Sequence, residues 1–346
     1  MTATIKDVAK KAKVSTATVS LALQDHRRIS SGTKKRVLKA VADLNYRPSH
    51  VARGLVMKKT HNIGFLLTDD HFLRTEPFYT NIFLGSEFEA RDHEFYLMLN
   101  TIPENFDECI HLPRFVLEKN VDGVILAGKV PHQIIECLEK VKMPMVFVDY
   151  YPPLGDYSAV LIDNVSGGEK ATEFLIQNGH THIAFIGGDM LHPSIRDRFQ
   201  GYKLALERHK INLDMNRVVT RESATNRSSG YHAAKVLLER GIKFTALFVC
   251  NDAMAIGAMQ CFREQGKKVP ADISIIGFDD VLEDMSTSPP LSSLRVPKIE
   301  MGTEGVRLLL GLFANTNQKS KKVLVPVELI PRESVIKIKN KIELNV

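Results

Sequence analysis

Short, uninterrupted apolar runs alternate with longer helix-like stretches from about residue 62 onward, and this alternation constrains the fold more than any other feature. Continuous apolar runs are typical of strands buried on both faces of a parallel α/β sheet. The first strands are expected at 63–67, 95–99, 121–126 and 145–148, with helices near 79–92, 107–119 and 131–141. These elements predict one doubly wound lobe.

A second set of the same kind predicts a second lobe. Its strands are expected at 183–186, 246–249 and 273–276, and its helices near 166–178, 194–209, 228–240 and 252–265. Open parallel sheets bind ligands outside the carboxyl ends of their strands. We therefore expect a binding site in the cleft between the two lobes.

The first 60 residues differ from this body in charge. They carry 14 basic and three acidic side chains, a formal charge of +11, whereas the remaining residues carry −5. Thr4 and Asp7 form a capping-box pattern, a second helix is expected over 16–23, and Ser30 is expected to cap a third helix. A small, strongly basic unit predicts a polyanionic partner.

Two short helices joined by a tight turn are typical of a helix-turn-helix. The side chains expected to form its core are Val8, Ala9, Val19, Val37, Leu38, Val41, Ala42 and Leu44. The outward face of 16–23 is small and polar, which suits entry into the major groove of DNA. A charged three-helix adaptor is the alternative, but the basic charge and the hydroxyl-rich second helix weigh against it.

Composition and motifs exclude several other classes. The chain is 44% hydrophobic and 25% charged, as globular proteins are. It has neither a membrane-spanning apolar run nor a secretory leader pattern, so we expect a cytoplasmic protein. The cysteines, Cys109, Cys137, Cys250 and Cys261, lack metal-site spacing, which favours reduced thiols. No GxSxG, Walker or HExxH motif indicates an enzyme, and neither a metal nor a cofactor is predicted.

Four segments near the start match a known family in order and spacing. They are Thr4-Ile5-Lys6-Asp7-Val8-Ala9, Val14-Ser15-Thr16-Ala17-Thr18-Val19-Ser20, Asn45-Tyr46-Arg47-Pro48 and Ala52-Arg53-Gly54-Leu55. The chain resembles the lactose-repressor/galactose-repressor (LacI/GalR) family of bacterial transcriptional regulators, and the resemblance extends through the body, clearly at 251–257 and 272–280.

The resemblance implies an all-α helix-turn-helix headpiece plus an α/β core of two doubly wound parallel-sheet lobes, like periplasmic sugar-binding proteins. The implied headpiece is 1–47, the hinge helix and linker are 48–60, and the effector-binding core is 61–340. The chain would cross between lobes near 162, 291 and 325. The near lobe would comprise 61–162 and 292–325, and the far lobe 163–291 and 326–340.

The resemblance also assigns DNA contacts by position. Thr16, Ala17 and Leu21 fall where the family reads bases. Leu21 can pack on a thymine methyl group but cannot make a bidentate contact to guanine. The residues implied near phosphates are Ser15, Thr18, Ser20, Gln24 and Arg28. For Thr18 and Ser20, plain solvation of the helix is the alternative.

Residues 48–55 resemble the hinge helix of the family. In the family this helix enters the minor groove, and a leucine at the position of Leu55 wedges between base steps and kinks the duplex. The hinge residues implied to contact DNA are Ser49, His50, Ala52, Arg53 and Leu55. A flexible linker is the alternative, since Gly54 weakens so short a helix.

Candidate effector-binding residues lie at strand ends and helix starts. They are Phe78, Tyr79, Asp149, Tyr150, Arg198, Thr225, Asn251 and Asp279. Carboxylates, amides and guanidinium groups suit vicinal hydroxyls, and aromatic faces suit the C–H side of a sugar ring. Phe78 as a core residue and Asp252 and Asp280 as helix caps are open alternatives.

One position departs from the family pattern. Thr225 stands where relatives often carry a large aromatic residue, and the chain has no Trp. An aromatic platform in the far lobe would therefore have to come from Phe199 or Tyr202. No specific sugar is predicted.

Operators of this family are pseudo-palindromic, so we expect a homodimer on double-stranded operator DNA. Tetrameric relatives carry an additional leucine-heptad tail, whereas this chain ends directly after its last core segment. A small-molecule effector in the cleft, a carbohydrate by family resemblance, would change operator affinity by altering the spacing of the hinge helices. A corepressor or a protein partner is the alternative. A sugar-binding protein of transport would share the body but lack the headpiece.

Overall fold

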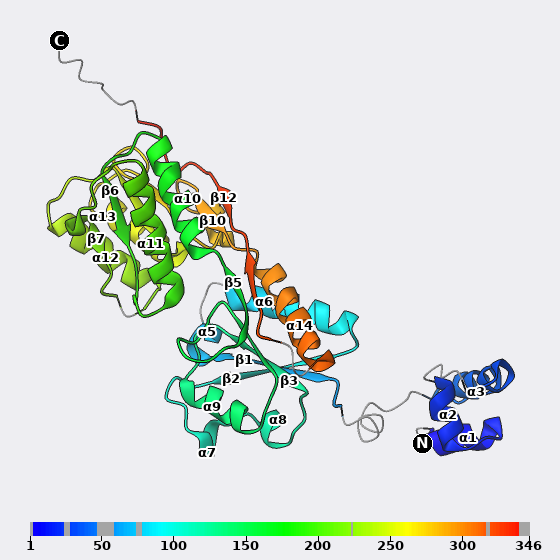
Figure 1. Cartoon of the computed structure of the whole chain (residues 1–346). Helices are drawn as coiled ribbons and strands as arrows, with labels where there is room; N and C mark the ends of the chain where they lie inside the picture. Colours follow the sequence, from blue (N-terminus) through cyan, green and yellow to red (C-terminus); the bar gives the residue numbers. More distant parts are fainter. Residues whose placement is uncertain are drawn as a thin grey trace, which may run out of the picture. The chain divides into compact units, whose positions relative to one another are not determined.

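The structure, a computed structural model, describes residues 3–23, 28–46, 59–73, 78–222, 224–315 and 319–338. The chain divides into two compact units, Met1–His61 and Asn62–Val346, and each is described on its own (Figure 1). None of the helices in these ranges is long and apolar enough to cross a membrane.

The first unit holds helices α1 (Ile5–Ala12), α2 (Thr16–Leu23) and α3 (Ser31–Asp43), which pack against one another in pairs. At the start of α1, the N–H and the hydroxyl of Thr4 donate to the Asp7 carboxylate at 2.8 and 2.7 Å. Ser30 accepts a hydrogen bond from the N–H of Thr33 and caps α3. Both predicted caps are confirmed.

Small side chains form the core of this headpiece. Its buried residues are Val8, Ala9, Ala12, Val19, Ala22, Val37 and Ala40. Val41 and Leu44 pack against them as predicted, whereas Leu38 is 45% exposed and Ala42 is exposed as well, so the expectation that these two residues face inward is wrong. The reason is helical geometry, because Leu38 lies one residue, or about 100°, beyond the buried Val37.

A six-stranded parallel sheet, in the order β11-β5-β4-β3-β1-β2, forms one lobe of the second unit. Its strands are β1 (Asn62–Thr68), β2 (Tyr96–Ile102), β3 (Gly123–Ala127), β4 (Met145–Val148), β5 (Ser158–Ile162) and β11 (Lys322–Val325). Alternate residues of a strand point to opposite faces. Ile125 of β3 accordingly joins one core cluster, and its neighbours Val124 and Leu126 join the other.

Helices cover both faces of this sheet (Figure 1). Those on or beside it are α5 (Asp69–Leu73), α6 (Phe78–Asp92), α7 (Glu108–His111), α8 (Arg114–Leu117), α9 (His132–Lys140) and α14 (Lys298–Ala314). The expectation of one helix over 107–119 is wrong, because Pro113 lies between α7 and α8 and lacks the N–H that a continuous helix requires.

The other lobe has a four-stranded parallel sheet in the order β7-β6-β8-β9. Its strands are β6 (Ile183–Ile186), β7 (Val218–Val219), β8 (Ala246–Val249) and β9 (Ser274–Ile276), and a short 3-10 helix, η1 (Met215–Arg217), precedes β7. Helix α10 (Asn164–Gln177) packs with α11 (Pro193–Arg208), and α12 (Arg227–Glu239) packs with α13 (Asp252–Glu264).

Two short strands connect the lobes. β10 (Ser293–Arg295) pairs antiparallel with β12 (Glu328–Ile330). β10 also lies beside the segment that follows β9, because the N–H groups of Gly277 and Asp279 donate to the carbonyls of Ser292 and Leu294. A 3-10 helix, η2 (Leu282–Met285), lies between β9 and β10.

Candidate functional site

Helix α2 carries the side chains that the family resemblance assigns to base reading. Thr16 and Ala17 are exposed on its first turn, and Leu21, four residues after Ala17, is half-buried on the same side. Leu23 packs against the headpiece core, but Leu21 is not among the described residues that do so. Val19 is fully buried. Helix α2 thus has a core side and an outward side with small, uncharged groups.

The residues predicted near phosphates have mixed surroundings. Ser15 Oγ accepts from the N–H of Thr18 at 3.1 Å and lies 2.9 Å from its hydroxyl, so Ser15 also caps α2. Ser20 is half-buried and Arg28 is exposed. The other predicted DNA contacts, Gln24, Ser49, His50, Ala52, Arg53 and Leu55, lie outside the described residues, and their roles stay predictions.

A cavity of about 700 Å³ lies between the two lobes of the second unit. Seven of the eight predicted effector-binding residues line it: Phe78, Tyr79, Asp149, Arg198, Thr225, Asn251 and Asp279. Most of the lining comes from the segments after parallel strands and from the first turns of helices, which is where open α/β sheets bind ligands.

Arg198 of α11 is 6% exposed and is held by the protein itself. Its Nε donates to Asn164 Oδ1 at 2.8 Å and its Nη1 to the carbonyl of Cys250 at 2.5 Å. Nη1 also lies 3.5 Å from Asp279 Oδ1, and the guanidinium carbon lies 3.7 Å from the centroid of the Phe278 ring. Arg198 therefore orients Asp279, and its Nε and Nη1 are committed to protein acceptors.

The opposite wall combines a buried carboxylate with stacked rings. Asp149 is 7% exposed, and its Oδ2 accepts from the Tyr79 hydroxyl at 3.0 Å. The Tyr79 ring stacks on His71 with centroids 4.6 Å apart, and the Phe78 ring meets it edge-on at 5.0 Å. Such a wall can accept a hydrogen bond from a ligand hydroxyl and cover an apolar ring face.

Two helix caps form another part of the lining. Asn251 Oδ1 accepts from the N–H of Met254 and caps α13, while its Nδ2 donates to the carbonyl of Thr225 at 2.9 Å. Asn226 caps α12 in the same way. Asn251 thus has a structural role in addition to the predicted effector contact.

Glycines let α12 and α13 bring these caps together. A Cβ atom on Gly230 of α12 would lie 2.0 Å from the carbonyl oxygen of Met254, and one on Gly257 of α13 would lie 1.9 Å from that of Arg227. Both distances are far below van der Waals contact, so any larger residue would push the helices apart. The shape of this wall depends on the two glycines.

The aromatic side chains of the far side do not reach the cavity in the way the sequence suggested. Phe199 and Tyr202 pack against Phe185 inside the lobe with their rings tilted to its ring, so neither forms an aromatic platform beside Thr225. Tyr150 is not among the described lining residues either. Its ring lies 6.1 Å from the ring of His192, which does line the cavity.

Several lining residues were not predicted from the sequence. Asp70, Glu104 and Lys129 each lie two residues beyond the end of a strand, and Asp189 lies three residues beyond β6. That shared position after parallel strands was the available signal. Ser194 lies one helical turn before Arg198 on α11 and faces the same cavity.

The cavity has an excess of carboxylates. Its lining acids are Asp70, Glu104, Asp149, Asp189 and Asp279, against the bases Lys129 and Arg198. Lys129 is exposed, and its ammonium lies 3.9 Å from Asp189 Oδ2. The arrangement favours ligands that donate hydrogen bonds and disfavours anionic ones. Within the described ranges, no group of three or more His, Cys, Asp and Glu side chains could hold a metal ion.

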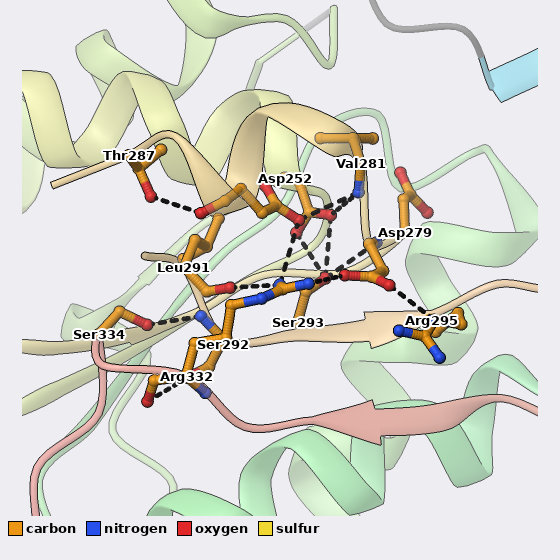
Figure 2. A network of polar contacts seen from close by, with 12 residues as sticks. Asp252, Asp279, Val281, Thr287, Leu291, Ser292, Ser293, Arg295, Arg332 and Ser334 are labelled. Atoms are coloured by element: carbon orange, nitrogen blue, oxygen red, sulfur yellow. Dashed lines mark hydrogen bonds and ion pairs between the residues drawn. The ribbon is translucent and has the colours of Figure 1, made fainter. Parts of the chain in front are cut away.

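Neither Asp252 nor Asp280 acts as a helix cap. Asp252 is fully buried, and its carboxylate accepts from the Ser293 hydroxyl at 2.7 and 2.9 Å (Figure 2). Burial first, and then the nearby charges of Asp284 and Asp279, raise the pKa of Asp252 well above its usual value. Asp280 pairs with two arginines. Both carboxylates belong to a polar network beside the cavity.

Comparison with known families gives a match for each unit. Residues 4–49 match the family described as bacterial regulatory proteins, lacI family. Residues 172–335 match a periplasmic binding protein-like domain. These ranges cover the helix-turn-helix and most of the two-lobed body.

Known proteins match almost the whole chain. The ribose operon repressor of Haemophilus influenzae is 32% identical over 337 residues, 97% of this chain and 100% of its own length. The HTH-type transcriptional repressor PurR of Aliivibrio salmonicida is 34% identical over 338 residues, with 97% and 100% covered. A structure of the lac repressor dimer bound to operator and the anti-inducer ONPF aligns with a TM-score of 0.79 at 27% identity, covering 97% of this chain and 100% of that one.

Proposed function

Because the chain belongs to the lacI family of bacterial regulatory proteins, we propose that a small, uncharged carbohydrate in the cavity controls its binding to operator DNA, which it binds as a homodimer. The coarser function is established: the protein is a LacI-type DNA-binding repressor, and its relatives are repressors and not enzymes. The same function implies a cytoplasmic location, where bacterial DNA lies. The cavity between the lobes is the observation that carries the proposal.

The lining of the cavity supports a polyhydroxylated, unphosphorylated effector. Asp149 and Asp279 offer acceptors to hydroxyl groups, and Phe78 and Tyr79 offer ring faces. A phosphate ester would add negative charge beside these two carboxylates, and Arg198 has its Nε and Nη1 bonded elsewhere. The charge and the hydrogen-bonding capacity of the lining therefore support this effector class.

A panel of matched ligands tests this proposal. Thermal unfolding of the full chain would be measured with D-ribose, D-glucose and D-galactose, and with the phosphate ester of each sugar. We expect at least one free sugar to raise the melting temperature and to change operator affinity, with no response to its phosphate ester. A response to an ester alone, or to no member of the panel, would contradict the proposal. The sign of the operator response separates an inducer from a corepressor.

Operator recognition needs its own measurement. Selection of bound sequences from a random DNA pool is expected to yield a pseudo-palindrome whose half-sites are read by Thr16, Ala17 and Leu21. The exposed or half-buried positions of these side chains on α2 support this role. A selected sequence without two related half-sites would contradict dimeric recognition.

An apolar surface on α6 and β2 supports the homodimer. β2 is an edge strand of its sheet, and Tyr96 and Leu99 on it are 60% and 40% exposed. Leu84 and Phe88 on the neighbouring α6 are 37% and 43% exposed. Exposed apolar side chains at a sheet edge and on the helix beside it are the kind that an interface covers. Sedimentation should give a dimer, and Phe88→Lys should yield monomers, whereas Leu154→Lys, at another exposed leucine, should not. A tetramer would contradict the proposal.

A further inference from the structure

A backbone segment of unusual conformation lies beside the cavity. Asp279 and Asp280 follow β9, and their φ angles are +115° and +51°. Residues with side chains rarely adopt this region, and such conformations persist only where the surrounding structure holds them. The contacts of these two residues therefore hold the segment in this conformation.

The first of the two residues faces the cavity. Asp279 lines the cavity, and its Oδ1 lies 3.5 Å from Arg198 Nη1. The second faces the strands that connect the lobes. Asp280 Oδ2 accepts from Nε of Arg295, in β10, at 2.7 Å, and Oδ1 accepts from Nη2 of Arg332, which follows β12. Of two adjacent carboxylates, that of Asp279 thus lines the cavity and that of Asp280 binds arginines of the two connecting segments.

The ion pairs of Asp280 are more than surface contacts. The side chain of Asp280 is 9% exposed and that of Arg332 is 15% exposed. Burial alone would raise the pKa of Asp280, but the hydrogen bonds from Arg332 and Arg295 outweigh it and leave the pKa below its usual value. Charge-assisted bonds at this depth hold geometry better than exposed ion pairs do.

Main-chain contacts fasten the same segment to the strands and to α14. The N–H of Asp279 donates to the carbonyl of Leu294 at 2.8 Å, and the N–H of Asp280 donates to Ser293 Oγ at 3.1 Å. Lys298, the first residue of α14, donates from Nζ to the Asp279 carbonyl. Its ammonium also lies 5.5 Å from the centroid of the Phe78 ring in the cavity lining. A shift of Asp279 must therefore move β10 or break these bonds.

We propose that Asp280 is a positioning residue that holds Asp279 at the cavity and passes effector occupancy to the two connecting strands. The proposal rests on the proposed function, in which the cavity takes the effector. Asp279 and Asp280 share one peptide plane, so a ligand that draws Asp279 toward itself reorients Asp280. Arg295 and Arg332 then carry that reorientation into β10 and to the end of β12, where the lobes are joined.

The test variant removes the negative charge of Asp280 but keeps a residue that tolerates a positive φ angle. Asp280→Asn suits this purpose because Asn also tolerates the left-handed conformation. Glu173→Gln is the matched control, since Glu173 accepts a 2.5 Å hydrogen bond from Arg208 on the same lobe but is not part of the cavity lining. If Asp280→Asn does not fold, Arg295→Gln replaces it, because the half-exposed Arg295 provides one of the two ties.

Operator affinity of the full chain would be measured with and without saturating D-ribose, D-glucose or D-galactose, whichever stabilises the wild type. The ratio of operator affinity with sugar to that without sugar measures the coupling, and allosteric couplings are about 5–150-fold. We expect Asp280→Asn to bring this ratio to within about twofold of one, and Glu173→Gln to leave it at the wild-type value. Arg295→Gln should give an intermediate ratio. Saturation separates lost coupling from weaker sugar binding, and a residue that only supports stability would leave the ratio unchanged.

The outcomes separate the two proposals. A wild type that responds to a sugar and an Asp280→Asn variant that responds equally would overturn the positioning role alone. A wild type that responds to none of the three sugars would overturn the proposed function, and this proposal with it. Hydrogen exchange supplies a measurement without ligand: Asp280→Asn should speed exchange in 293–297, and unchanged exchange there would also overturn the positioning role.

Discussion

The headpiece and the two-lobed body are built and used in different ways. Among the described residues, the buried core of the headpiece consists of valine and alanine, whereas the largest fully buried side chains of the body are Tyr202 and six phenylalanines. Small units bury a smaller fraction of their surface and are less stable for it. The headpiece exposes its recognition groups on one helix, and the body collects its binding groups from many segments around a cavity.

The largest effect should come from the weaker core. Val37 is fully buried between the headpiece helices, and Val37→Asp places a carboxylate where it has no partner. We expect the headpiece to unfold and operator binding to be lost, while the body keeps its unfolding transition and its sugar binding. Calorimetry and operator titration measure both. Operator binding that survives would show that the headpiece core is more tolerant than its composition implies.

The second effect concerns the body. Asp279→Asn removes a charged acceptor from the cavity, and hydrogen bonds to charged groups contribute about 1.5–3 kcal/mol, so sugar affinity should fall about 10–100-fold. Titration calorimetry measures this with the sugar that stabilises the wild type. Asp197→Asn, which breaks an exposed pair with Arg196 on the same helix as Arg198, is the control and should bind normally. Equal affinities for both variants would remove Asp279 from the site.

The same contrast explains what the sequence could predict. Headpiece features follow from local rules, so the Thr4–Asp7 and Ser30 caps and the burial of Val19 were predicted and are confirmed. In the body, the apolar runs predicted β1 to β4, β6, β8 and β9, but they did not single out β5, although it is buried in the middle of its sheet. The exposed edge strand β11 and the two-residue β7 carry too little apolar signal to stand out.

The cavity required knowledge of side-chain direction and of long-range partners. Phe199 and Tyr202 lie close in sequence to the lining residue Arg198, yet their side chains point from α11 into the interior of the lobe. Asp280 resembles a helix cap in sequence, and only the fold brings Arg295 and Arg332, 15 and 52 residues later, to its carboxylate. Periodicity fixes which residues are buried but not which distant charges meet.

The third effect is a pH dependence whose sign differs between the body and the headpiece. Burial raises the pKa of Asp284 to about 6, and the unfolded chain would titrate near 4. This group therefore stabilises the fold below about pH 4, and that contribution is lost as the pH rises through about 6. Asp284→Asn should gain stability relative to the wild type as the pH rises through this window, by on the order of 1–2 kcal/mol.

Thermal melts of wild type and Asp284→Asn across pH 4–7 measure this difference. In the headpiece, hydrogen bonds from Thr4 lower the pKa of Asp7, so its contribution has the opposite sign and is lost as the pH falls. Asp7→Asn is the corresponding headpiece variant. A stability difference for Asp284→Asn that stays constant across the range would contradict the assignment.

The smallest effect concerns base reading by the headpiece. Leu21→Ala removes an apolar side chain that we expect to pack on a thymine methyl group, and the loss should be about 1 kcal/mol, or roughly fivefold, at the selected operator. Because no charge is removed, affinity for random DNA and its salt dependence should not change. Leu23→Ala is the control: Leu23 packs on the core, so this variant should lower the melting temperature of the headpiece. Equal weakening of Leu21→Ala on operator and random DNA would mean that this side chain supports the helix and does not read sequence. The uncharged face of α2 would then contribute affinity without choice, and specificity would have to come from other residues of the headpiece or from the hinge.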